Sequence, residues 1–302
     1  MNLIELKKKA RELRRATLDM CVKAEAGHIT TAFSCTEILV TLYYSGILRF
    51  KPEYPSWSGR DRFILSKGHA CTVLYLILAD LGFFPEEWLD TFCQKDGRLG
   101  IHLEKNIPGV EITTGSLGHG LGVAVGMALA AKMDKEHHFI FALLSDGECF
   151  EGSTWESAML AGHHRLNNLI AIVDRNWQCA TDFTENCVKL NPLADKWKAF
   201  SWDVIDIDGH SFDEIFSALD GFRCKKRNKP LVIIADTVKG KGISFMEYEP
   251  LWHGRVPKGE EIKQTRRQLQ IAEVIYGRRI NAQEVEDDFV MKEVKRLREG
   301  LE

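Results

Sequence analysis

The chain has 302 residues, of which 45% are hydrophobic and 27% are charged, so it carries enough apolar material for a folded core. Its 40 Lys and Arg nearly balance its 43 Asp and Glu, which gives a formal net charge of -3. This balance lacks the basic surplus that a nucleic-acid-binding surface usually needs. We therefore expect neither a disordered chain nor a nucleic acid partner.

The ends and the cysteines of the chain do not indicate export from the cell. The N-terminus has an amphipathic helical pattern that carries Glu5 and Glu12, and no apolar core or cleavage site follows it. The longest weakly polar run, 120–131, falls short of the roughly 20 residues that span a bilayer. The eight cysteines include no C-x-x-C pair. These features predict a cytoplasmic protein with reduced thiols and no membrane partner.

Helical patterns dominate the first hundred residues. Apolar and charged residues alternate at helical spacing from residue 2 to about 26, and Gly27 with His28 then forms a turn, which places His28 on a loop. The next predicted elements are a helix over 36–44, a short strand over 62–65, and helices over 70–81 and 86–93. The polar, glycine-punctuated stretch 97–118, which contains His102, predicts a long functional loop.

From residue 120 onward, predicted strands and helices alternate. They are a helix over 120–132, a strand over 139–144, a helix over 153–164, strands over 169–173 and 203–207, a helix over 212–219 and a strand over 231–237. Such alternation predicts an α/β fold with a doubly wound, mostly parallel sheet that has helices on both faces. Because no Pro-, Gly- or Ser-rich linker divides the chain, we expect one domain over 1–302 with a charged helical tail from about 258.

Polar residues follow two consecutive predicted strands at the edge where open α/β sheets bind ligands. Asp146 and Gly147 come just after one strand, and Asn176 follows the next strand, thirty positions after Asp146. A helix begins soon after Gly147, and its N-terminus would suit a phosphate. One carboxylate and one amide oxygen suit Mg²⁺, which completes its octahedron with phosphate and water. Because Asp-Gly turns and asparagines after strands are also common, this pair alone leaves a purely structural interpretation open.

Several further motifs surround this pair, in a consistent order along roughly residues 10 to 260. They are Gly27-His28, Ser66-Lys-Gly-His69-Ala, Pro108-Gly-Val-Glu-Ile-Thr-Thr-Gly115-Ser116-Leu117-Gly-His-Gly120, Asp146-Gly147-Glu148-Cys-Phe-Glu151, Asn168-Leu-Ile-Ala-Ile-Val-Asp-Arg-Asn176, Lys239-Gly-Lys-Gly and His253-Gly254. In these motifs the chain resembles transketolases, above all in their thiamine-diphosphate signature. The resemblance implies the thiamine-diphosphate-binding fold of the pyrophosphate-domain type.

The resemblance also implies a role for each matching residue. Asp146, Asn176 and the backbone carbonyl of Gln178 would ligate Mg²⁺, and Gly147 would donate its N–H to the diphosphate. The other implied cofactor contacts, besides these residues, are His69, Gly115, Ser116, Leu117, Glu148, Glu151 and His253. The implied catalytic residues are His28, His69, His102 and His253. Imidazole titrates near neutrality, so such a cluster suits repeated proton exchange with sugar hydroxyls.

Two glutamates and the remaining histidines have alternative interpretations. Glu151 and Glu156 match positions near the subunit interface of the family. A simpler interpretation is that Glu151 stabilises a helix N-terminus and that Glu156 is a solvated helix residue. The histidines expected to be structural are His137, His138, His163, His164 and His210.

The implied reaction transfers a two-carbon glycolaldehyde unit from a ketose phosphate to an aldose phosphate, with thiamine diphosphate as the electron sink. Transketolases activate this cofactor with a glutamate on a separate pyrimidine-binding domain, which nothing in the sequence resembles. We therefore expect a split enzyme, in which this N-terminal subunit pairs with a separate C-terminal subunit in an α₂β₂ assembly. Two alternatives stay open: transfer to a lipoyl or carrier-protein thiol, and a non-catalytic regulatory subunit.

Overall fold

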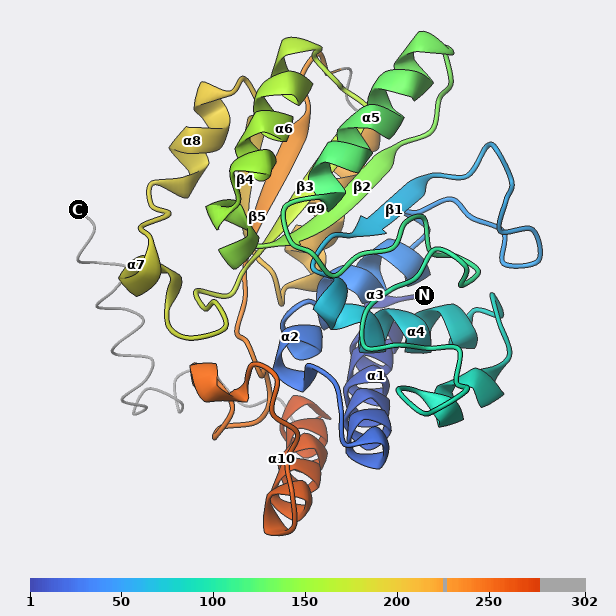
Figure 1. Cartoon of the computed structure of the whole chain (residues 1–302), viewed down its shortest axis with the longest axis vertical. Helices are drawn as coiled ribbons and strands as arrows, with labels where there is room; N and C mark the ends of the chain where they lie inside the picture. Colours follow the sequence, from blue (N-terminus) through green and yellow to red (C-terminus); the bar gives the residue numbers. More distant parts are fainter. Residues whose placement is uncertain (225–226, 278–302) are drawn as a thin grey trace.

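In the computed structural model, which describes residues 1–224 and 227–277, five strands form one parallel sheet (Figure 1). The strands are β1 (Arg62–Leu65), β2 (Ile140–Ser145), β3 (Leu169–Arg175), β4 (Asp203–Asp208) and β5 (Leu231–Asp236). Their order across the sheet is β1-β2-β3-β5-β4, and every neighbouring pair is parallel. The predicted α/β class with a parallel sheet is confirmed.

The apolar strands supply both hydrophobic cores of the chain. Successive side chains of a strand point to opposite faces, so Phe141 and Leu143 of β2 enter one core while Ala142 and Leu144 enter the other. Every residue of β2 and β3 is buried, which is possible because helices cover both faces of the sheet. This explains why these strands are continuous apolar runs without a polar alternation.

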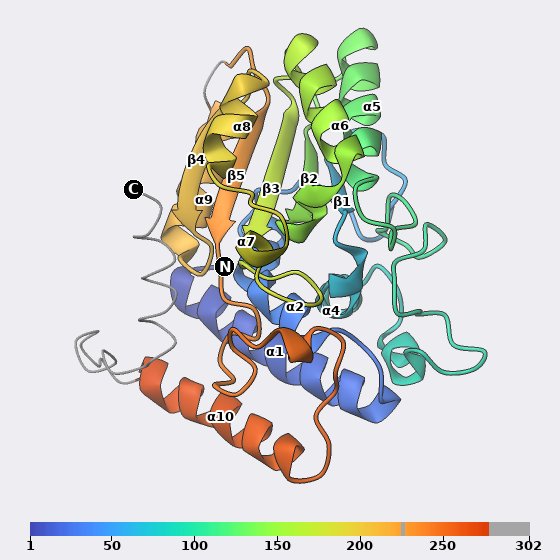
Figure 2. The same cartoon turned by 60° about the vertical axis from the view of Figure 1, so that its left-hand side comes forward.

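The helices form layers on both sides of the sheet. Their bounds are α1 (Leu3–Ala24), α2 (Ile29–Ser34), α3 (Thr36–Tyr44), α4 (Cys71–Asp80), α5 (Gly120–Met133), α6 (Gly152–His163), α7 (Thr184–Cys187), α8 (Leu193–Ala199), α9 (Phe212–Cys224) and α10 (Glu260–Gly277), with short 3₁₀ helices at Gly68–Ala70, Glu86–Thr91, Gly147–Phe150 and Pro250–Trp252. Helices α5, α6 and α8 cover one face, and α3 and α9 lie on the other. Figure 2 shows α1, α2 and α10 beyond the ends toward which the strands run.

The strand order explains why α9 lies on the opposite face from α5, α6 and α8. The chain moves across the sheet from β1 to β2, β3 and β4, and it then returns from β4 to β5, between β3 and β4. Crossover connections between parallel strands are right-handed, so a reversal of direction places the connecting helix on the other face. The single return step therefore makes the sheet doubly wound.

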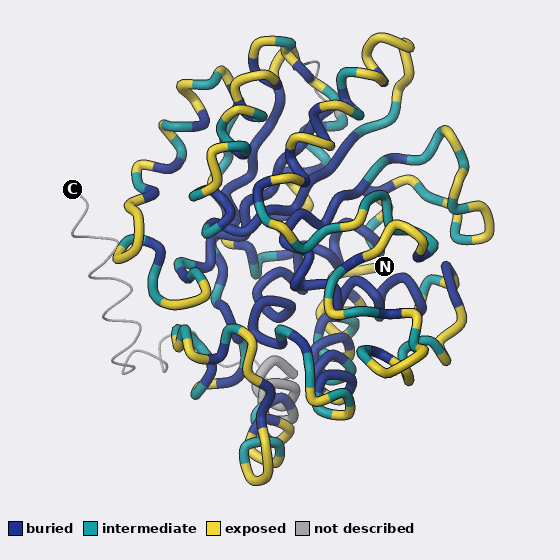
Figure 3. The backbone as a smooth tube through the Cα atoms, viewed as in Figure 1, coloured by how far each residue is buried: buried dark blue, intermediate teal, exposed yellow. Residues whose placement is uncertain are grey.

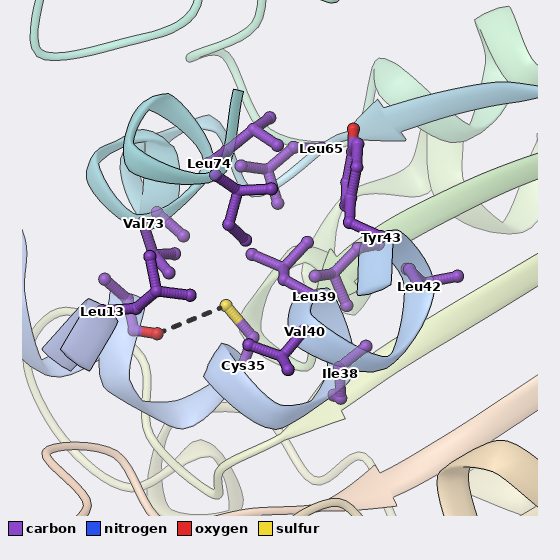
Figure 4. Packing of buried hydrophobic residues seen from close by; sticks show 14 of the residues in the cluster. Leu13, Cys35, Ile38, Leu39, Val40, Leu42, Tyr43, Leu65, Val73 and Leu74 are labelled. Carbon is purple, nitrogen blue, oxygen red and sulfur yellow. Dashed lines mark hydrogen bonds between the residues drawn. The ribbon is translucent and has the colours of Figure 1, made fainter. Parts of the chain in front are cut away.

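The N-terminal helices build the core beside the carboxyl ends of the strands. Every residue of α3 from Thr36 to Tyr43 is buried, because α1, α4, α9 and the sheet surround this helix. Figure 4 shows side chains of α3 packed beside those of α1, α4 and β1, including Leu13, Ile38, Leu39, Val40, Leu65, Val73 and Leu74. No helix in the described part of the chain is long and apolar enough to cross a bilayer.

Several local elements differ from the sequence-based expectations. The predicted helix over 86–93 is a 3₁₀ helix over Glu86–Thr91, and α2, α7 and α8 were not predicted. Helix α2 is six residues long and buried throughout, so it has no polar face to produce a helical period. The expected tail begins as α10 at Glu260, whereas residues 278–302 lie outside the described residues.

We expect Gly162→Ala to destabilise the fold, because α6 touches the chain after α8 at this glycine. A Cβ atom at Gly162 would lie 1.8 Å from the carbonyl oxygen of Phe200, so α6 would have to shift. Overpacking of this kind costs about 1–3 kcal/mol of unfolding free energy, measured by urea denaturation. The matched control is Gly221→Ala in α9, where a Cβ would meet no atom within 4 Å and should stabilise the helix by up to about 1 kcal/mol. Equal stability of the two variants would contradict the prediction.

Candidate active site

Two of the three predicted metal ligands, Asp146 and Asn176, follow strands that end at one edge of the sheet. Strands β2 and β3 pair in a register that sets Ser145 opposite Asp174, so the residues that follow both strands leave the sheet together. The backbone N–H of Asp146 donates to the carbonyl of Asp174 over 3.2 Å. The carboxylate of Asp146 accepts the N–H of Trp177 over 2.6 Å, one residue after Asn176. The structure thus brings the surroundings of Asp146 and Asn176 together.

Asp146 is fully buried, and its carboxylate has three donors. These are the N–H groups of Gly147 at 2.8 Å and Trp177 at 2.6 Å, and the guanidinium of Arg175 at 3.2 Å. Burial raises the pKa of Asp146 to about 6, although Arg175 opposes this rise. The surrounding protein therefore neutralises this carboxylate only in part, which is the condition under which a bound cation is stabilising.

Asn176 and Gln178 present neutral oxygen atoms beside Asp146. The side-chain oxygen of Asn176 accepts the N–H of Gln178 over 3.2 Å. A Cβ built on Gly147 would lie 4.0 Å from the carbonyl oxygen of Gln178, so this carbonyl lies next to the Asp146-Gly147 turn. Trp177, between them, has a left-handed backbone with φ of 66°. Since no group of three or more His, Cys, Asp or Glu in the described residues could hold a metal, a cation here would rely on these neutral oxygens.

The four histidines predicted to be catalytic lie together, although 225 positions separate the first from the last. The ring of His28 lies 5.5 Å from that of His69, 6.1 Å from that of His102 and 5.4 Å from that of His253, between centroids. The rings of His69 and His253 are 5.3 Å apart. Each comes from a loop or a 3₁₀ turn at the carboxyl side of the sheet, which explains how residues so distant in sequence meet.

Most of these imidazoles are neutral at physiological pH. Burial, His102 and Lys239 lower the pKa of His28 to about 4. Burial and Lys239 lower the pKa of His253 to about 3, and burial with Lys67 holds the pKa of His69 well below its usual range. The expectation of titration near neutrality is therefore wrong for these three side chains, because they are removed from water and lie beside ammonium groups. A neutral imidazole offers one donor and one acceptor nitrogen.

Lys239 belongs to this cluster and was not predicted from the sequence. Its ammonium group donates to Nδ1 of His253 over 2.8 Å and to the carbonyl of Cys179 over 3.0 Å. Because Nδ1 accepts, the neutral His253 ring carries its proton on Nε2. Burial lowers the pKa of Lys239 to about 8. The sequence marks this residue only as the start of the Lys-Gly-Lys-Gly motif. Its burial could not be expected, because lysines are usually exposed.

A second buried lysine, Lys67, forms an ion pair with Asp174. Both side chains are fully buried, and Asp174 also accepts the hydroxyls of Ser34 at 2.6 Å and of Thr237. Lys67 donates in addition to the carbonyl of Thr31 over 3.2 Å. The ion pair therefore ties the Ser66–His69 turn and α2 to the ends of β3 and β5.

The remaining predicted cofactor residues divide into three groups. Gly115 and Leu117 face the cavity that the histidines line, and a Cβ on Gly115 would lie 3.2 Å from the His102 ring. Glu148 is buried beneath this loop, where its carboxylate accepts the hydroxyl of Ser66 and the N–H of Gly118 at 2.8 Å. Ser116 and Glu151 are exposed, and Glu151 occupies the N-cap position of α6 without a capping hydrogen bond from its side chain.

The histidines and the Asp146 turn enclose one cavity of about 330 Å³. Its lining includes His28, His69, His102, Gly115, Leu117, Gly147, Asn176, Gln178, Lys239 and His253. Nδ1 of His28 and both polar side-chain atoms of Gln178 are buried without a hydrogen-bond partner within the described structure. Buried polar atoms are normally paired, so these atoms are available to a polar ligand. A larger hollow of about 960 Å³ lies beyond Arg175 and Trp177 and contains none of these histidines.

Comparisons with known proteins agree on one family. A family model described as the thiamine diphosphate binding domain of transketolase matches residues 6–295. One subunit of the apulose-4-phosphate transketolase of Phocaeicola vulgatus is 39% identical over 89% of this chain and 95% of that protein. The 6-deoxy-6-sulfo-D-fructose transketolase subunit SqwG of Clostridium sp. is 43% identical over 81% of this chain and 88% of that protein. Transketolase from Campylobacter jejuni has a similar structure, with a TM-score of 0.84 at 34% identity, and the match covers 89% of this chain but 43% of that one.

We expect Lys239→Met to raise the pKa of His253 and of His28. The ammonium group of Lys239 disfavours a second positive charge on both rings, so its removal favours their protonation. Histidine NMR signals followed against pH would measure both values, with assignments from single His→Gln variants. Lys241→Met is the matched control, since Lys241 lies on the same turn and is not among the groups that lower these pKa values. An unchanged His253 titration in Lys239→Met would contradict the contact between these two side chains.

Proposed function

The chain belongs to the transketolase family, as a thiamine-diphosphate-binding domain, and we propose that it is the N-terminal subunit of a split transketolase. In this proposal the enzyme transfers a two-carbon glycolaldehyde unit from a ketose phosphate to an aldose phosphate in the cytoplasm. The observation that supports it most is the cavity of about 330 Å³ that four histidines, Lys239 and Gly147 line together. When bound there, thiamine diphosphate supplies the electron sink for cleavage and formation of the C–C bond.

The charges around the cavity fit a metal-bound diphosphate. We assign Asp146, Asn176 and the Gln178 carbonyl as Mg²⁺ ligands, because the buried carboxylate is only partly neutralised and the other two oxygens lie beside it. Lys239 would bind the anionic oxygens, since its present acceptors are a neutral carbonyl and a neutral imidazole. His69 and His253 would donate N–H groups to the same oxygens.

The neutral state of His28, His69 and His253 determines which hydrogen bonds they can make. His253 carries its proton on Nε2 and can donate it. His28 lines the cavity, and its Nδ1 is buried without a partner among the described residues. A neutral imidazole can accept a hydroxyl proton from a sugar and return it later, because its nitrogen is unprotonated before the reaction. We propose that His28 and His102 orient and deprotonate substrate hydroxyls, while His69 and His253 hold the diphosphate end. This division follows from the hydrogen bond between Lys239 and His253 and from the positive charge of Lys67 beside His69.

A partner subunit is part of the proposal. Two relatives that match along most of their own length are named as transketolase subunits. The outer face of the α5–α6 layer also fits an interface. Figure 3 shows exposed stretches along both helices, and the exposed large apolar side chains there include Val123, Met159 and Leu160. Gly126 is exposed in the middle of α5, and a Cβ there would meet no atom within 4 Å. A glycine disfavours a helix by about 1 kcal/mol relative to alanine, so the close approach of another chain would explain it. The partner would carry the activating glutamate, in an α₂β₂ assembly.

The substrates are proposed by class. One relative is named for a sugar phosphate, apulose 4-phosphate, and another for a sulfonated sugar, 6-deoxy-6-sulfo-D-fructose. We therefore propose a ketose with an anionic end as the donor and an aldose phosphate as the acceptor. Transfer to a lipoyl or carrier-protein thiol is the competing reaction, and an assay of the assembled enzyme with a lipoyl domain in place of the aldose would detect it.

We expect Asp146→Ala to weaken thiamine diphosphate binding at least about 100-fold, on the order of 3 kcal/mol, because the diphosphate loses its metal bridge. Isothermal titration calorimetry with Mg²⁺ present would measure the affinity. Asp208→Ala is the matched control, because Asp208 ends strand β4 at the same edge of the sheet but lies outside the cavity. Micromolar affinity retained by Asp146→Ala would refute the assignment.

The split-enzyme proposal predicts that the purified chain, given thiamine diphosphate and Mg²⁺, does not turn over a ketose and an aldose at enzymatic rates. Addition of the separate C-terminal subunit should restore turnover, because it supplies the activating glutamate. Transfer activity can be followed by the appearance of the new ketose. Ordinary turnover by the chain alone would overturn the proposal.

A substitution on the exposed face of α5 tests whether this activity depends on the proposed interface. Gly126→Leu should leave the fold and the cofactor affinity of the isolated chain intact, since the added side chain points into open space. It should weaken assembly and restored turnover, measured by analytical ultracentrifugation and by the same assay. Gly221→Leu in α9, at a glycine that is equally unobstructed, should affect neither.

A further inference from the structure

Two cysteines lie side by side on the loop that follows β3. Cys179 comes directly after Gln178, and Cys187 ends the single turn of α7. Their sulfur atoms are 3.4 Å apart. The loop doubles back between them, because the N–H of Cys179 donates to the carbonyl of Asp182 over 2.9 Å and Gln178 bridges Phe183. The fold itself therefore sets the two thiols in contact.

This pair differs from the four buried cysteines of the described residues in its access to solvent. Cys187 is exposed and Cys179 is half-buried, whereas the fully buried cysteines are Cys21, Cys35, Cys71 and Cys149. A small reagent in solution can reach Cys187 directly. To form a disulfide within the chain by thiol–disulfide exchange, the reagent must reach one thiol and a second thiol must lie within reach of the first. Cys187 and Cys179 meet these two conditions.

We propose that Cys179 and Cys187 are a thiol-oxidation site that forms a reversible disulfide by exchange with a low-molecular-weight disulfide. Cys187 first attacks this reagent, which gives a mixed disulfide and releases one small thiol. Cys179 then attacks the sulfur of Cys187 and displaces the second small thiol. Two protein thiols lose two hydrogens in total, and the reagent gains the same two protons and two electrons.

The disulfide needs only a small movement, and most of it falls on Cys187. The sulfur atoms must approach from 3.4 Å to about 2.0 Å, a shift of about 1.4 Å. Cys179 is held by Lys239, which donates to its carbonyl, and by the turn to Asp182, whereas Cys187 lies exposed at the end of one helical turn. The bond therefore closes the loop while Cys179 stays in place.

The position of Cys179 makes this bond a modification of the active-site wall. Cys179 lines the cavity, and its Cβ would lie 3.4 Å from a Cβ built on Gly147. It also follows Gln178, whose carbonyl we assign to the metal. Oxidation would thus cross-link the segment that carries one wall of the site, whichever ligand the cavity holds.

The test uses the full chain and oxidised glutathione. Trypsin releases both thiols in one peptide, 176–189, because no Lys or Arg lies between Arg175 and Lys189. After incubation, alkylation and digestion without reductant, we expect this peptide to weigh two hydrogens less than its reduced form and to carry no alkyl group. Cleavage at Glu185 should leave two fragments that separate only after dithiothreitol is added.

Three variants make the result specific. Cys93→Ser, which removes another partly exposed thiol, should keep the cross-linked peptide. Cys187→Ser and Cys179→Ser should each lose it, and the remaining thiol should be alkylated or carry one glutathione. In the oxidised chain without substitutions, a peptide with two alkyl groups, a peptide with two glutathiones, or a disulfide only between two chains would overturn the proposal.

Discussion

The buried ion pair between Lys67 and Asp174 holds the site together. Burial alone would lower the pKa of Lys67, but Asp174 raises it above its usual range, so both groups remain charged in the interior. Four segments meet at this pair: the turn before His69, α2 after His28, the end of β3 before Asn176, and Thr237 before Lys239. Removing one partner of a buried pair leaves an uncompensated charge and typically costs about 3–5 kcal/mol. One interaction therefore fixes both the histidine cluster and the edge of the sheet that carries Asp146 and Asn176.

The electrostatic character of the cavity follows from what surrounds that pair. Lys67 is neutralised by Asp174, whereas Lys239 is held by a carbonyl and an imidazole, which leaves a net positive wall beside three neutral histidines. The Asp146 carboxylate, which follows β2, is buried and only partly compensated by Arg175. A cation near Asp146 and an anion near Lys239 would each relieve one of these imbalances. A divalent cation would suit the Asp146 side, and the anionic diphosphate that it binds would suit the Lys239 side.

The sequence predicted the strands better than the short helices, and the site positions better than their protonation. Strands such as β2 are apolar on both faces, so they stand out, whereas α2 is buried all round and α7 has a single turn. The histidines could be predicted because motif resemblance identifies positions, and the structure brings all four to one cavity. Their roles stay predictions, as does the single domain over 1–302. Burial of Lys67 and Lys239 could not be foreseen, because composition places lysines at the surface and only tertiary packing supplies Asp174 and His253 as partners.

Trp177 gives the site an optical property of its own. Its backbone N–H donates to Asp146, its ring stacks on Arg175 at 3.8 Å, and its indole N–H donates to Asp236. Arg175 also contacts the Asp146 carboxylate, so the indole is coupled to that carboxylate through both its own backbone and its stacking partner. Indole emission responds to nearby charge and to solvent. The chain has six other tryptophans, so the part of its emission that is lost in a Trp177→Phe variant is the part that responds to binding at Asp146, without any attached label.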